Sequence, residues 1–68
     1  MKLKELFVGM DKNLTVQVHY VNKNKDVDFA VQKRIERFAA YTRLLEDKVI
    51  NITKDKNGMP IIETGGAK

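Results

Sequence analysis

Apolar and polar residues alternate along the segment 14–21. Its apolar side chains occupy every second position: Leu14, Val16, Val18 and Tyr20. A period of two, rich in β-branched and aromatic residues, is typical of a β-strand with one buried face. We therefore predict a strand over 14–21, followed by a polar loop at 22–25.

The segment from Asp26 to about Asp47 shows a different, helical spacing. Side chains that fall on one stripe at intervals of three or four residues are Val27, Val31, Ile35, Phe38, Thr42 and Leu45. Such a stripe predicts one long amphipathic helix that packs on a sheet. Asp26 or Asp28 would cap its first turn, where a carboxylate favours the positive end of the helix dipole.

A β-hairpin is predicted after this helix. The segments 49–53 and 59–64 are strand-like, and Asn57-Gly58 between them supplies the positive φ angles that a tight hairpin turn needs. Pro60 has no backbone N–H to donate to a neighbouring strand. The last strand is therefore expected at an edge of the sheet.

The first ten residues fit two structures. Leu3, Leu6, Phe7 and Met10 have helical spacing, but the segment can also be a strand that ends at the turn around Gly9. We favour the strand, because the strand over 14–21 needs a neighbour, and keep the helix as the alternative.

These elements predict an α+β fold in the order β-β-α-β-β, with the first segment helical in the alternative. One long amphipathic helix would cover one face of a small, mostly antiparallel sheet. The 68 residues are expected to form a single domain over 1–64, with a flexible C-terminal tail over 65–68. A chain this short buries a thin core, so either that core is packed very well or an oligomer completes it between subunits.

The chemistry of the chain argues against an enzyme. It has no cysteine, no serine and a single histidine, His19, so neither a common zinc site nor a serine triad can be built. The four glycines are scattered and form no phosphate-binding loop. We therefore expect no catalytic residue, no cofactor and no metal.

Localisation is expected to be cytoplasmic. No apolar run approaches the roughly 20 residues that span a bilayer, and the charged start of the chain is not followed by the apolar stretch of a signal peptide. The size and composition are those of the small accessory proteins that phages and mobile elements encode.

The predicted helix offers a binding surface beside its core stripe. Phe29 and Leu44 cannot both reach the core if the stripe does, and an exposed apolar residue beside small alanines is typical of a protein interface. The candidate interface is Ala30, Arg37, Ala40, Tyr41 and Leu44. A small accessory or regulatory protein that binds a partner protein or itself, most simply as a homodimer, is the function expected first.

Nucleic-acid binding is the alternative function. The net charge of +4 mildly favours an acidic partner. Basic and aromatic side chains of the predicted helix that could grip phosphates and stack on bases are Lys33, Arg34, Arg37, Tyr41 and Arg43.

Two resemblances follow from these segments. The hairpin-helix-strand order ending in Gly65-Gly66 resembles the ubiquitin-like β-grasp, whose members use a terminal diglycine in conjugation or sulfur transfer; here Ala67 and Lys68 follow. The pattern Val31-x-x-Arg34-Ile35-x-Arg37-Phe38, with Tyr41 and Leu45 before two strands, is similar to part of the ribosome-hibernation factor fold, and this resemblance covers about half of the chain. The second helix of that fold has no counterpart in this sequence.

Overall fold

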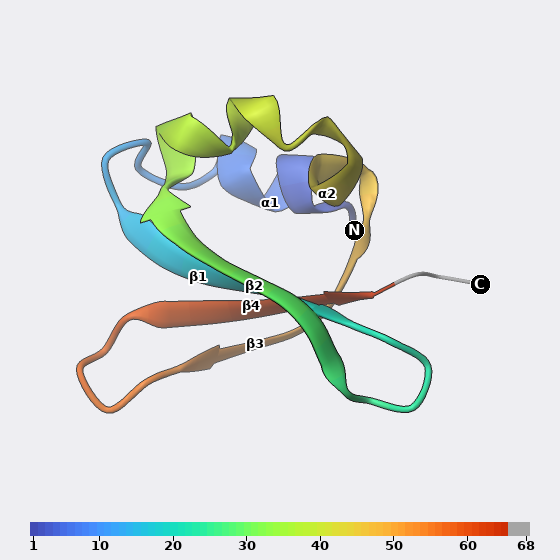
Figure 1. Ribbon diagram of the computed structural model, residues 1–68. Coiled ribbons are helices and arrows are strands. Elements are labelled where there is room, and N and C mark those ends of the chain that lie inside the picture. The colour runs from blue at the N-terminus through green and yellow to red at the C-terminus, as the bar shows by residue number, and fades with distance from the viewer. Residues whose placement is uncertain (66–68) are drawn as a thin grey trace.

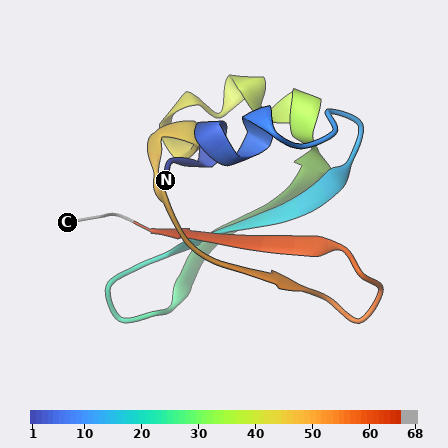
Figure 2. The same ribbon diagram turned by 180° about the vertical axis from the view of Figure 1, so that it is seen from behind.

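The computed structural model describes residues 1–65 and gives a small α+β fold. Its elements are α1 (Leu3–Val8), β1 (Thr15–Val21), β2 (Val27–Arg34), the 3₁₀ helix η1 (Ile35–Ala40), α2 (Thr42–Glu46), β3 (Lys48–Lys54) and β4 (Pro60–Gly65). The three short helices lie together on one side of the four-stranded sheet, and both hairpin turns project away from them (Figures 1 and 2). Of the predicted tail over 65–68, only Gly65 is described, as the last residue of β4.

The sheet is mixed, with the strand order β2-β1-β4-β3. Two antiparallel hairpins, β1–β2 and β3–β4, are joined by a parallel pairing of β1 with β4, in which Val18 lies beside Ile62. The expected edge position of the last strand is therefore wrong, because β4 is central. Pro60 is tolerated as the first residue of that strand, where a missing N–H costs little.

The predicted long helix over 26–47 is also wrong, since no helix within residues 1–65 exceeds six residues. Residues 27–34 form β2 instead, with Phe29 opposite Tyr20 and Val31 opposite Val18. Within β2, Phe29 and Val31 are two residues apart and share one face of the strand, whereas Ile35 begins the 3₁₀ helix.

Both family resemblances assumed the long helix that the structure does not contain within residues 1–65. The connection from β2 to β3, which the ubiquitin-like resemblance treated as one helix, is a 3₁₀ helix followed by a short α-helix. The pattern likened to the hibernation factors begins in a strand, since Val31 and Arg34 belong to β2.

The first segment is helical, so the preferred strand was wrong and the alternative is confirmed. Backbone hydrogen bonds tie the start of the chain to the start of β3: the Leu3 N–H donates to the Asp47 carbonyl (3.0 Å) and the Val49 N–H to the Met1 carbonyl (2.8 Å). The N-terminus is thereby held beside α2.

The predicted turn at Asn57-Gly58 is confirmed. Gly58 has a φ of +85°, which favours glycine, and the Asp55 carboxylate accepts from the backbone N–H groups of Asn57 (2.8 Å) and Met59 (2.9 Å). The strands predicted at 14–21, 49–53 and 59–64 are found at nearly the same positions.

The core lies between the helices and one face of the sheet. Its buried side chains are Leu3, Phe7, Val16, Val18, Ile35, Phe38, Leu44 and Ile62. Thr64 is buried beside them, and its hydroxyl donates to the His19 carbonyl (3.0 Å) across the parallel pairing. Among residues 1–65, no helix lies on the opposite face of the sheet (Figures 1 and 2).

Phe38 should be essential for stability, because its side chain is fully buried between Phe7 and Tyr41. We expect Phe38→Ala to lower the free energy of unfolding by about 3–5 kcal/mol. Phe29→Ala is the matched control, since Phe29 is 45% exposed and its loss should cost about 1 kcal/mol. Urea unfolding of both variants measures the difference, and equal losses would contradict this description of the core.

Candidate functional site

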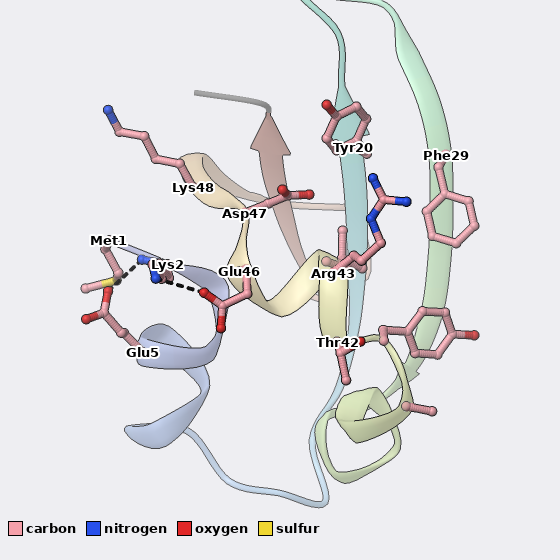
Figure 3. Close-up of a pocket in the computed structure, with 13 residues that line it drawn as sticks. Met1, Lys2, Glu5, Tyr20, Phe29, Thr42, Arg43, Glu46, Asp47 and Lys48 are labelled. Carbon is pink, nitrogen blue, oxygen red and sulfur yellow. Dashed lines mark hydrogen bonds and ion pairs between the residues drawn. The ribbon is translucent and has the colours of Figure 1, made fainter. Parts of the chain in front are cut away.

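A broad open groove lies between the helices and the part of the same sheet face that they leave uncovered (Figure 3). Tyr20 and Phe29 contribute the sheet side of this groove, and the segment from Ala40 to Leu44 forms its helical wall. The N-terminal residues Met1, Lys2 and Glu5 close the far end. Its volume of about 1350 Å³ is large enough for a peptide segment or several side chains of a partner.

Aromatic rings lead from the core into this groove. Phe7 packs on Phe38 with ring centroids 5.3 Å apart, and Phe38 packs on Tyr41 at 5.6 Å. Tyr41 in turn lies 6.5 Å from Phe29, with the two rings tilted by 40°. The half-exposed Phe29 ring is therefore backed by a packed aromatic row, which limits its freedom before any partner binds.

An ion-pair cluster closes the rim of the groove where α1 meets α2. Lys2 Nζ lies 2.8 Å from Glu46 Oε1, and Lys4 Nζ lies 2.6 Å from Glu46 Oε2. Hydrogen bonds from Lys2 and then Lys4, together with their positive charges, lower the pKa of Glu46 to about 2. The hydrogen bond and charge of Glu46 raise the pKa of Lys2 in return.

The groove opens beside β2, which is an edge strand. Within residues 1–65, β1 is the one strand that pairs with β2. Val27 and Phe29 on this edge are 51% and 45% exposed. An edge with unpaired backbone groups and exposed apolar side chains can accept another strand.

The predicted interface residues do not share one helix face. Ala40, Tyr41 and Leu44 line the groove, whereas Ala30 lies in β2 and Arg37 is exposed on η1. Leu44 is only 7% exposed, so the expected exposed leucine is wrong and Leu44→Asp would place a charge in the core. Of Phe29 and Leu44, which the sequence predicted could not both reach the core, Phe29 is the one that stays exposed.

The basic residues are also distributed over three elements. Lys33 and Arg34 belong to β2, where consecutive side chains point to opposite faces of the sheet; Arg37 is on η1 and Arg43 on α2. Arg34 Nη2 pairs with Glu36 Oε2 at 3.2 Å. A single basic helix face is therefore not formed, and the nucleic-acid role of these residues stays a prediction.

The sheet face opposite the helices carries a group of polar side chains. The Gln17 side-chain amide donates to that of Gln32 (3.2 Å), and His19 Nε2 lies 2.8 Å from Gln17 Oε1. Glu63 is beside His19 in the parallel register. Across the described residues no group of three or more His, Cys, Asp or Glu side chains could hold a metal ion, and no helix is long and apolar enough to cross a membrane.

Sequence reasoning missed the β2 edge because it placed the same residues in a helix. The signal for a strand was present, since Phe29 and Val31 are separated by one small residue. No protein-family model, curated protein or solved structure matches the chain.

The Glu46 cluster should make stability depend on pH. Because the pKa of Glu46 is lowered to about 2 from an ordinary 4.5, its contribution is present above about pH 4.5 and is lost as the pH falls toward 2. We expect Glu46→Gln to lower the melting temperature at pH 7 and to make little difference near pH 2. The side chains are half exposed, so the effect should be small and should shrink in high salt.

Asp47→Asn is the matched control, since the neighbouring Asp47 side chain pairs with no cation among residues 1–65. Thermal unfolding of the three proteins across this pH range measures the effect. A melting-temperature difference between wild type and Glu46→Gln that stays constant from pH 7 to pH 2 would contradict the stabilising role of the cluster.

Proposed function

We propose that this protein is a small non-catalytic accessory or regulatory protein that acts by binding protein through the β2 edge and the adjoining groove. The observation that carries the proposal is the position of Phe29. Its ring is half exposed on β2, which pairs with β1 alone among residues 1–65; the ring faces the groove and is backed by Tyr41. The predicted interface residues Ala40 and Tyr41 belong to the same groove.

Strand addition is a common way to bind such an edge. Backbone hydrogen bonds to the edge supply affinity, and pockets for alternate side chains supply specificity. A preordered aromatic residue loses little conformational freedom when a partner covers it, so such residues often dominate binding energy. The β2 edge and the groove beside it combine both features.

Nucleic-acid binding remains the second candidate, and the position of Arg43 favours it. The Arg43 side chain extends over the sheet in the direction of Tyr20 and Phe29 (Figure 3). Within residues 1–65 it forms no ion pair, so its charge is available to a phosphate beside rings that could stack on bases. Four basic residues on three elements give this candidate less support than the edge gives protein binding.

Photo-crosslinking inside cells separates the two candidates. A photoreactive phenylalanine analogue at position 29 should give adducts that protease removes and nuclease does not. The control is the same analogue at Thr53, which is exposed on the other edge strand, β3. We expect protein adducts at position 29 and few at position 53.

If nuclease removes the adducts at position 29, the result would contradict protein binding and favour the nucleic-acid candidate. Equal adducts at both positions would contradict the proposed site, because they would show that no particular surface is engaged.

A further inference from the structure

The charged residues of β2 are divided between its two ends. Asp26 and Asp28 lie at the N-terminal end of the strand, and Lys33 and Arg34 lie at its C-terminal end. Two copies of this strand placed antiparallel would bring the acidic end of each against the basic end of the other. Opposite charges on neighbouring strands stabilise a pairing, and like charges destabilise it.

We infer that the β2 edge pairs with the β2 edge of a second copy of this chain, which joins two four-stranded sheets into one continuous sheet. This inference rests on the proposed function and names its partner. A two-fold axis perpendicular to the sheet relates the copies, as is usual for homodimers. The helices of both copies then lie on the same side.

This symmetry restricts the register. Opposed residues must share a face of the sheet, and the regular stretch of β2 runs from Phe29 to Arg34, since the pairing with β1 shifts at Tyr20/Val21. Placing Val31 on the axis sets Phe29 opposite Lys33 and Ala30 opposite Gln32. Asp28 at the end of the pairing then meets Arg34.

The register also covers the exposed apolar surface. The Lys33 stem of one copy would lie against the Phe29 ring of the other, with its ammonium group beside the ring face. Arg34 forms an ion pair with Glu36, but both side chains are half exposed and such a pair is weak. Arg34 can therefore exchange this partner for Asp28 of the second copy. Asp28 is held at the edge by a hydrogen bond from Asn22 Nδ2 (3.0 Å).

The other edge strand lacks this complementarity. β3 begins with Lys48 and ends with Lys54, so an antiparallel self-pairing would oppose these two lysines. A contact between β2 and β3 of different copies would set Lys33 and Arg34 near Lys48.

Two charge variants test the inference in sedimentation experiments. The basic-edge variant carries Asp26→Lys and Asp28→Lys, and the acidic-edge variant carries Lys33→Glu and Arg34→Glu. Wild type should be a dimer. Each variant alone should dissociate about thirty-fold or more readily, because the two contacts between positions 28 and 34, one at each end of the pairing, change from opposite charges to like charges. An equimolar mixture of the two variants should form a heterodimer, and a control with Lys48→Glu and Lys54→Glu on β3 should stay dimeric.

Cysteine crosslinking tests the register with the charges intact, so it does not depend on the folding of the charge variants. The chain has no cysteine of its own, and Ala30 and Gln32 are exposed. A mixture of Ala30→Cys and Gln32→Cys proteins should form a disulfide between copies under mild oxidation, since opposed strand residues lie within disulfide range. Asn51→Cys on β3 is the exposed control and should not crosslink.

Any one of four results would overturn the inference. In sedimentation these are a wild type that is monomeric at 100 µM, charge variants that are each dimeric alone, and a mixture of the two variants that stays monomeric. In crosslinking it is a disulfide yield at Asn51 equal to that at positions 30 and 32. The proposed function would survive these results if position 29 crosslinks to a different protein in cells. It would fail separately if position 29 crosslinks to no protein.

Discussion

The parallel pairing of β1 with β4 is the contact on which the rest of the structure depends. It joins two hairpins that would each be marginal alone, and it places Val18 beside Ile62 under the helices. Thr64 can be buried there because its hydroxyl donates to the His19 carbonyl across this pairing. Once these two strands occupy the centre, β2 and β3 have to be the edges.

The candidate site follows from how little helix is available to cover this sheet. α1, η1 and α2 are each five or six residues long and pack over one end of it (Figure 1). The apolar face continues past them to Tyr20 and Phe29, so a groove remains where a longer helix would have packed. The two edges then differ in charge: β3 carries lysine at both ends, whereas β2 is acidic at one end and basic at the other.

The sequence predicted those parts of the fold that local residues determine. Alternation over 14–21 and the turn residues at Asn57-Gly58 indicated strands and a hairpin that are present. The segment 26–34 was misassigned because Val27 and Val31, four residues apart, fit a helix stripe, and the strand spacing of Phe29 and Val31 was not weighed against it. The parallel central pairing could not be predicted, since it depends on which strands become neighbours after the connection from β2 to β4 has folded. Of the candidate site, the sequence identified Ala40 and Tyr41. The edge strand beside them was not predicted, because its residues were assigned to a helix.

Amide hydrogen exchange, followed residue by residue at several protein concentrations, tests the central claim most directly. Exchange slows where backbone N–H groups are held in stable pairings. The account predicts slow exchange in β1 and β4 at every concentration, and exchange in β2 that slows as the concentration rises while β3 is unchanged. Protection that increases in β3 and not in β2, or central strands that exchange as fast as the edges, would contradict it.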